Sequence, residues 1–231
     1  MNNSALKFDA VIFDNDGTVL DAAPGILASA NAAFAELGYP AMEMARFMPF
    51  LGPPLQDSFT QFAGMSAQEA ERAIAIYRRE YNAGNCFVLE VYDGMEALLR
   101  KLRAAGVKTA IASSKPTVFL EKILSGIGLR ELFDAVCGVA LNRLHGGKDD
   151  IIAEAARQCG VPLERCLMVG DRRFDVEGAH ALGIPCVGVL YGYGSREELE
   201  AAGVDFLAET CEALEGICLK NTLTFPHNVL K

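Results

Sequence analysis

Two aspartates separated by one residue stand in the segment Phe13-Asp14-Asn15-Asp16-Gly17-Thr18, directly after the apolar run Ala10-Val11-Ile12-Phe13. Such a run is typical of a buried strand in a parallel sheet. A strand that ends in Asp-x-Asp delivers carboxylates to the carboxyl edge of the sheet, where open α/β folds bind ligands. There, one acid can attack phosphorus while both hold a divalent metal ion. An acidic turn is the alternative interpretation, because Asp and Gly are common turn residues.

A second candidate site is Ser113-Ser114-Lys115, at the end of the strand expected over residues 108–112. A hydroxyl there, together with the backbone N–H groups that open the next helix, can form a phosphate cradle. The alternative is a serine that only caps the helix.

Lys148 is a third candidate, in Gly146-Gly147-Lys148-Asp149. The segment fails the P-loop pattern, because Asn142 stands where Gly is required and Asp149 replaces Ser or Thr. Lys148 is therefore either a solvated surface lysine or a lone cation aimed at the sheet edge.

The fourth candidate, Gly170-Asp171-Arg172-Arg173-Phe174-Asp175, follows another expected strand over residues 165–169. It adds two acids, Asp171 and Asp175, at the same edge as Asp14 and Asp16. Like charges crowd unfavourably unless a cation compensates them. Oxygen ligands without nearby His or Cys favour Mg²⁺. A structural turn at Gly-Asp is the alternative.

Strands and helices alternate along most of the chain, with further strands expected over residues 133–139 and 185–190. This alternation predicts an α/β fold with a Rossmann-like, doubly wound parallel sheet. A stretch with only helical patterns, from residue 22 to about residue 88, interrupts it just after the first strand. The expected domains are an α/β core of residues 1–20 and 90–231 and an inserted helical domain of residues 21–89, in which Ser66 and Glu69 form a capping box.

The four sites together resemble the motifs of the haloacid dehalogenase superfamily: Asp-x-Asp-x-Thr, a strand-end Ser or Thr, a Lys, and Gly-Asp-x-x-x-Asp. The helical insert is similar to that family's cap domain. Gly52-Pro53-Pro54-Leu55 and Ser113-Ser114-Lys115-Pro116 further resemble the phosphoglycolate phosphatase and 5′-nucleotidase-like branch. Asn15 stands at the variable position of the first motif, where Leu or Met is commoner.

The resemblance implies a Mg²⁺-dependent phosphomonoester hydrolase that acts on a small phosphorylated metabolite through an aspartyl-phosphate. Asp14 would be the nucleophile and Asp16 the general acid and base. The implied phosphate-binding residues are Ser113, Ser114 and Lys148, and Lys115 is a second candidate for the phosphate lysine. The implied metal site comprises Asp14, Asp16 and Asp171, with Asp175 behind them. A sugar-phosphate mutase is the main alternative, and a non-enzymatic phospho-acceptor signalling module is a weaker one.

Composition limits the partners of this 231-residue chain, whose net charge is −9. An acidic chain is a poor candidate for binding nucleic acid or anionic membranes. Seven scattered cysteines without a Cys-x-x-Cys indicate reduced thiols in a cytoplasmic protein. No apolar run approaches the ~20 residues of a membrane span. These features indicate a cytoplasmic protein, and we expect it to act as a monomer or homodimer.

Overall fold

The first strand, β1 (Ala10–Phe13), lies inside a six-stranded sheet in the computed structural model, which describes residues 8–140 and 147–219. The strand order is β5-β4-β1-β6-β7-β8, and every pairing is parallel. The other strands are β4 (Lys108–Pro116), β5 (Ala135–Val139), β6 (Cys166–Gly170), β7 (Cys186–Val189) and β8 (Phe206–Ala208). The prediction of a doubly wound parallel α/β sheet is confirmed.

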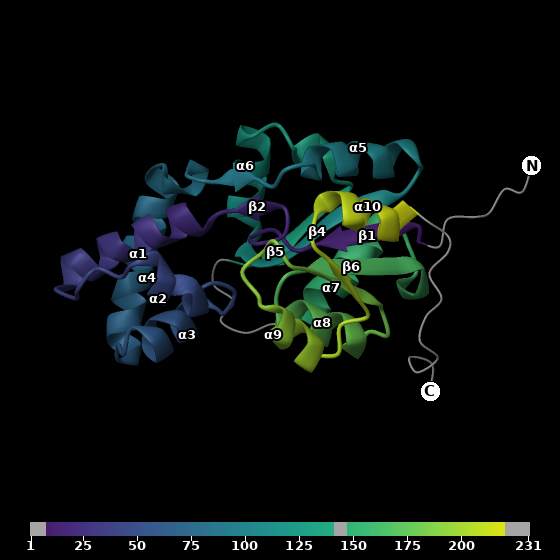
Figure 1. The fold of residues 1–231 in the computed structure, drawn as a ribbon. Helices are drawn as coiled ribbons and strands as arrows, with labels where there is room; N and C mark the ends of the chain where they lie inside the picture. The colour runs from purple at the N-terminus through teal and green to yellow at the C-terminus, as the bar shows by residue number, and fades with distance from the viewer. Residues whose placement is uncertain (1–7, 141–146, 220–231) are drawn as a thin grey trace, which may run out of the picture. The chain divides into compact units, whose positions relative to one another are not determined.

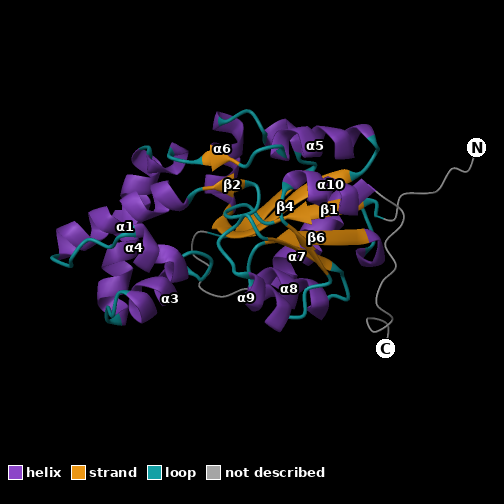
Figure 2. Cartoon of the chain, viewed as in Figure 1, coloured by secondary structure: helices purple, strands orange, loops and turns teal. Residues whose placement is uncertain are grey.

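The helices of this α/β unit cover both faces of the sheet (Figure 1). They are α5 (Met95–Ala104), α6 (Thr117–Gly126), α7 (Lys148–Cys159), α8 (Arg173–Ala181), α9 (Arg196–Ala201) and α10 (Cys211–Leu219), with short 3₁₀ turns η4 (Arg130–Leu132) and η5 (Leu163–Arg165). Figure 2 shows α5 and α10 on one face and α7 and α8 on the other. All four residues of β1 are fully buried, as expected for a strand covered on both sides.

The strand order reverses beside β1, which defines where a ligand can bind. The chain proceeds from β1 to β4 and β5 on one side and then returns to β6, β7 and β8 on the other. Phe13 pairs in register with Ile111 of β4 and with Val169 of β6. Residues just beyond these three positions therefore share one edge, at the switch point where open α/β sheets form their binding crevice.

Contacts between Cα atoms divide the chain into two units, Met1–Val19 with Val91–Lys231 and Leu20–Glu90. The second unit is mostly helical. It contains β2 (Leu20–Asp21), α1 (Ala23–Leu37), α2 (Met44–Phe47), η1 (Met48–Phe50), α3 (Leu55–Asp57), the π-helical turn η2 (Ser58–Phe62), α4 (Ala67–Ala83) and η3 (Asn85–Phe87). The short strand β3 (Glu90–Val91) pairs with β2 at the boundary.

Aromatic packing holds the helical unit together. Phe50 stacks on Phe47 at 4.6 Å between ring centroids and meets Phe59 edge-on at 5.0 Å. The predicted capping box at the start of α4 is confirmed: the Glu69 N–H donates to Ser66 Oγ, and the Ser66 N–H donates to Glu69 Oε2 at 2.9 Å. The cap satisfies backbone donors that the first turn of α4 would otherwise leave unpaired.

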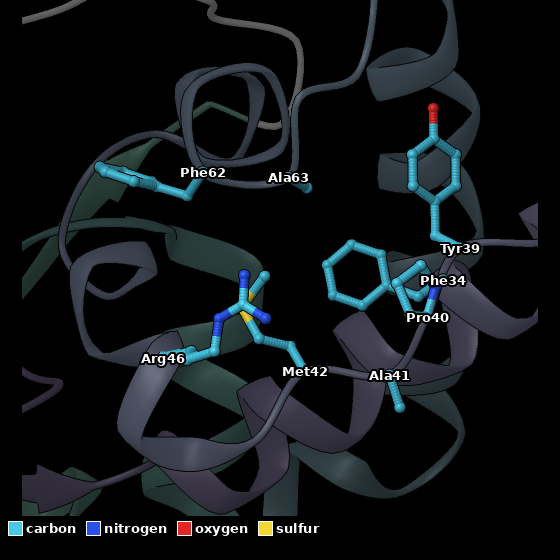
Figure 3. A pocket seen from close by; sticks show the side chains of 8 residues that line it. All are labelled: Phe34, Tyr39, Pro40, Ala41, Met42, Arg46, Phe62 and Ala63. Atoms are coloured by element: carbon cyan, nitrogen blue, oxygen red, sulfur yellow. The ribbon is translucent and has the colours of Figure 1, made fainter.

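A pocket of about 130 Å³ lies within the helical unit, beside Phe34, Met42 and Arg46 (Figure 3). In Figure 3 the Phe34 ring and the Arg46 guanidinium both point toward its middle. The Asn31 side chain holds the loop that forms one wall, because it donates to the Met42 carbonyl at 2.9 Å and accepts from the Met42 N–H at 2.8 Å. The pocket is smaller than the roughly 300 to 1,000 Å³ of most metabolite sites.

Several element boundaries differ from the sequence-based expectation. The strand expected over residues 108–112 continues as β4 to Pro116, and the strand β8 and helices α9 and α10 had no expected counterpart. Residues 141–146 and 220–231 lie outside the described residues. Among the described helices, none combines the length and the apolar character that a membrane span requires.

Candidate active site

The first motif leaves β1 at the switch point of the sheet. The Asp14 N–H donates to the Val169 carbonyl of β6 at 2.9 Å, so the parallel pairing continues into the motif and holds the Asp14 backbone at the sheet edge. Gly17 follows with a φ of +86°. A Cβ there would lie 2.1 Å from Asp171 Oδ2. Only glycine allows this turn and the close approach of the two motifs.

The second acidic motif joins the first through the end of β6. Asp171 is fully buried; its Oδ1 accepts from Thr18 Oγ1 at 3.2 Å and its Oδ2 from the Tyr193 N–H at 2.8 Å. Asp175, in the first turn of α8, is 1% exposed, and its Oδ2 accepts from the Arg172 N–H at 3.1 Å. Asp171 therefore lies against Thr18 and Gly17 of the first motif, as expected for two motifs that leave neighbouring parallel strands at one edge.

Three of these carboxylates form a potential metal site. Asp14, Asp171 and Asp175 each offer one oxygen, and these oxygens lie within 4.8 Å of one another. Burial raises the pKa of Asp171 well above its usual value, and the Asp175 and Asp14 charges raise it further. Burial likewise raises the pKa of Asp175 to about 6, although Lys148 opposes that shift. Raised pKa values of buried acids indicate that nearby positive charge does not fully compensate their negative charge. An all-oxygen set of this kind fits Mg²⁺.

Lys148 is the cation placed among these acids. Its Nζ lies 3.0 Å from Asp14 Oδ1 and 2.7 Å from Asp175 Oδ1, and 9% of its side chain is exposed. Burial alone would lower the pKa of Lys148, but the two carboxylates more than offset this and raise it. The alternative interpretation, a solvated surface lysine, is therefore wrong.

The position of Lys148 depends on the packing of α7 against α8. Gly178 of α8 faces the first turn of α7, and a Cβ at Gly178 would lie 2.8 Å from Lys148 Cβ and 3.1 Å from the Asp149 nitrogen. Neither atom is the free end of a flexible side chain, so one helix must shift.

We expect Gly178→Ala to lower kcat about 10-fold, because it moves Lys148 away from the acids. Even a small displacement of a positioned group strongly lowers the catalytic rate. Glycine to alanine in a helix normally stabilises a protein by roughly 1 kcal/mol. Thermal unfolding measured beside kcat distinguishes the two effects. Glu177→Ala, which removes an exposed ion pair with Arg173 in the same helix, is the control and should leave kcat unchanged. A more stable and fully active Gly178→Ala protein would contradict the packing argument.

The end of β4 brings the remaining candidates to the same edge. Ser113 is 2% exposed, whereas Ser114 is exposed. The strand continues through them to Pro116, and α6 begins only at Thr117, so Ser113 and Ser114 do not themselves open the helix. Lys115 turns back toward the first motif: its Nζ lies 2.7 Å from Asp16 Oδ2. The two candidate lysines thus contact different acids.

The sequence analysis gave no role to Thr18 and Asn15 of the first motif, and it missed Tyr191 and Tyr193. Thr18 and the Tyr193 N–H hold Asp171, as described above. Tyr191 donates from its hydroxyl to the Thr18 carbonyl at 3.3 Å, which ties the loop after β7 to the first motif. Asn15 is fully buried and donates to Asp16 Oδ1 at 2.8 Å. Only the place of Asn15 inside the first motif could have drawn attention to it.

The cysteines and the described histidine take no part in this cluster. All seven cysteines are free, and six of them are buried. Burial raises the pKa of Cys137 to about 11 and of Cys166 to about 12, so these thiols are poor nucleophiles. His180 Nε2 lies 2.9 Å from Asp205 Oδ2, between α8 and the turn before β8. His145 and His227 lie outside the described residues.

Comparison with known proteins gives consistent results. The family described as "Haloacid dehalogenase-like hydrolase" matches residues 11–189. A "5'-nucleotidase" of Pseudomonas aeruginosa is 36% identical, over 87% of this chain and 91% of its own. A "Tyrosine-protein kinase PtkA" of Mycobacterium tuberculosis is 37% identical over 82% of this chain, which spans 65% of that protein. A "Phosphoglycolate phosphatase, plasmid" of Cupriavidus necator is 31% identical over 94% of this chain and 96% of its own.

The fold has a similar solved counterpart. The crystal structure of a "predicted phosphatase" from Clostridium acetobutylicum superposes with a TM-score of 0.86 and 36% identity, over 92% of this chain and 98% of the other. Both the family resemblance and the branch expected from the motifs are confirmed by these matches. The chain belongs to the haloacid dehalogenase-like hydrolase family.

Proposed function

We propose that this protein is a Mg²⁺-dependent phosphomonoester hydrolase that acts on a small phosphorylated metabolite. The observation that carries the proposal is the cluster at the switch point of the sheet, where Asp14, Asp171 and Asp175 converge and Lys148 Nζ lies between two of them. Such a site favours a ligand that combines a divalent cation with a phosphate group. Relatives named 5'-nucleotidase and phosphoglycolate phosphatase support the same class of substrate.

The metal would be held by the Asp14 and Asp171 carboxylates and by Asp16 through its backbone carbonyl, with Asp175 orienting the cluster. When bound, Mg²⁺ would neutralise part of the negative charge of the acids and of the phosphoryl group. Without it, the buried acids should repel a phosphate dianion.

Asp14 acts as the nucleophile in this proposal. Its carboxylate oxygen bonds to phosphorus while the ester P–O bond breaks, which yields an aspartyl-phosphate. Asp16 gives a proton to the departing alcohol oxygen. In the second step, Asp16 takes a proton from water, the water oxygen bonds to phosphorus, and the Asp14–phosphorus bond breaks. Ser113, Ser114 and Lys148 stabilise the charge on the transferring oxygens.

The helical unit Leu20–Glu90 would be the cap that selects the substrate, inserted between β1 and the rest of the α/β core. The net charge of −9 disfavours nucleic acid and membrane surfaces as partners. Seven free thiols support a reducing compartment such as the cytoplasm. We further propose that the protein acts as a monomer or homodimer.

The test is phosphate release from sugar phosphates, nucleoside monophosphates and 2-phosphoglycolate. We expect turnover of several substrates with Mg²⁺ and a loss of at least about 10²-fold after chelation, since a catalytic metal contributes several kcal/mol. Isomerised sugar phosphate without released phosphate would favour a mutase. Stable phosphorylation of the protein without turnover would favour a signalling module, and transfer from ATP to tyrosine would favour the activity named for PtkA.

A further inference from the structure

We propose that Asn15 and Lys115 are positioning residues that hold the Asp16 carboxylate in one orientation for proton transfer. This inference rests on the proposed function, in which Asp16 protonates the leaving group. Lys115 Nζ lies 2.7 Å from Asp16 Oδ2 and 2.9 Å from Asp16 Oδ1. Asn15 Nδ2 donates to the same Oδ1 at 2.8 Å. Both carboxylate oxygens are therefore held, by groups from two separate segments of the chain.

Asn15 is the less expected member of the pair. Its side chain is fully buried, yet its Oδ1 has no hydrogen-bond partner among residues 8–140 and 147–219. A buried amide with an unsatisfied oxygen is destabilising, and an apolar residue of the same shape would avoid that cost. Within the described part of the chain, the Asn15 side chain makes one hydrogen bond, its donation to Asp16. Stability does not explain the residue, whereas orientation of Asp16 does.

Lys115 lies in the irregular end of β4. The register between β4 and β5 shifts between Ala112 and Pro116. Irregularities of this kind redirect side chains and often lie beside active sites. Lys115 lies within this shifted stretch, and 8% of its side chain is exposed. A lysine this buried, held against a carboxylate, has far less rotational freedom than a surface lysine.

The two lysines of the site then have separate tasks. Lys148 is already engaged by Asp14 and Asp175, on the side of the nucleophile. Lys115 contacts Asp16, which is 20% exposed and thus open to a substrate oxygen. The orientation of the Asp16 carboxylate should affect the rate of phosphoryl transfer most when the departing oxygen needs a proton. An aryl phosphate with a stable phenolate leaving group needs little such help.

The experiment compares leaving groups. The variants Asn15→Leu and Lys115→Met are assayed on p-nitrophenyl phosphate and on the best alkyl phosphate of the substrate panel, both with Mg²⁺. We expect kcat/KM for the alkyl ester to fall about 10-fold or more, against less than about 2-fold for the aryl ester, because correct proton transfer contributes roughly 10² to 10⁴ in rate. The ratio kcat/KM reports the first, phosphoryl-transfer step, so a slower second step does not obscure it.

Two controls separate this role from others. In an Asp16→Asn background, Asn15→Leu should cause no further leaving-group effect, since no proton is transferred there. Lys115→Arg should recover part of the alkyl activity. Asn15→Leu should unfold at the same or a higher temperature than the wild type, which removes loss of folding as an explanation. If Lys115→Met fails to fold, Asn15→Leu still decides the proposal.

Three outcomes would overturn the inference. Equal losses on both esters, with weaker inhibition by inorganic phosphate, would make Lys115 a phosphate ligand instead. Unchanged kinetics in both variants would show that the contacts have no role in the reaction. A leaving-group effect that persists in the Asp16→Asn background would show that it does not act through Asp16. Failure of the proposed function looks different, because the wild type would then release no phosphate from any ester.

Discussion

Replacing Asp14 by asparagine is expected to lower kcat by at least about 10⁴-fold, the scale seen when other covalent nucleophiles are removed. An amide oxygen is a far weaker nucleophile than a carboxylate and cannot form the aspartyl-phosphate. The fold should survive. Asp14 raises the pKa of both Asp171 and Asp175, so its neutralisation relieves repulsion among the acids. We expect the chelator-treated variant to unfold at the same or a higher temperature than the wild type.

The measurement combines phosphate release with detection of the phosphorylated protein after acid quenching. Wild-type protein should carry a hydroxylamine-sensitive phosphoryl group, and Asp14→Asn should carry none. Asp9→Asn is a matched control, because Asp9 is half-exposed and pairs with Arg165 at 2.7 Å. It should change kcat by less than about 2-fold, as exposed pairs contribute little. Mg²⁺-dependent hydrolysis that persists in Asp14→Asn would show that another residue attacks phosphorus.

Replacing Lys148 by methionine is expected to affect both stability and activity. Removal of one partner from a buried ion-pair cluster leaves the other charges uncompensated, which costs about 3 to 5 kcal/mol. The free energy of unfolding of the chelator-treated protein should fall by about that amount at pH 8. The variant should also lose roughly 10²- to 10³-fold in kcat, as expected when a donor to a developing charge is removed. Added Mg²⁺ should restore part of the stability but little of the activity.

The stability deficit of Lys148→Met should be smaller at pH 5 than at pH 8. The folded pKa of Lys148 is raised, so its stabilising effect is present throughout this range and would be lost only at strongly alkaline pH. The folded pKa of Asp175, raised to about 6 by burial even with Lys148 beside it, should rise further in the variant. A carboxyl with a raised folded pKa progressively destabilises the fold as pH rises from its unfolded pKa to its folded pKa. At pH 5 it is largely protonated, so the missing cation matters less.

Lys101→Met is the control for this experiment. Lys101 is 56% exposed on the α5 helix and pairs with Glu215 at 2.8 Å. Its loss should cost less than about 1 kcal/mol at either pH. A deficit for Lys148→Met that is equally small, or that is the same at pH 5 and pH 8, would contradict the assignment of Lys148 as the cation that compensates the acids.

Local sequence patterns were sufficient for the main features of the fold. The apolar run before Asp14 and the similar run before Gly170 predict β1 and β6, because strands covered on both faces must be continuously apolar. Their parallel pairing then follows from the alternation of strands and helices. Since carboxyl ends of parallel strands meet at one edge, the convergence of Asp14 and Asp171 could be predicted without coordinates.

The parts of the fold that were missed have weaker local signals. The strand β8 has three residues, only one of them buried, so its sequence shows no strong period. The extension of β4 through Ser113 and Ser114 depends on pairing with β5, which the sequence of β4 alone does not reveal. Pairing across a sheet is a long-range contact, and propensity alone determines it poorly.

The sequence by itself determined which residue types reach the sheet edge: the acids of two motifs, the serine and the two lysines. Only the tertiary structure decided which lysine contacts which acid. Lys148 lies against Asp14 and Asp175 where Gly178 allows α7 to approach α8, and Lys115 lies against Asp16 from the stretch of β4 in which the register with β5 shifts. Both placements arise from packing between elements that are distant in sequence. Neither the periodicity of the sequence nor the spacing of its motifs predicts such contacts.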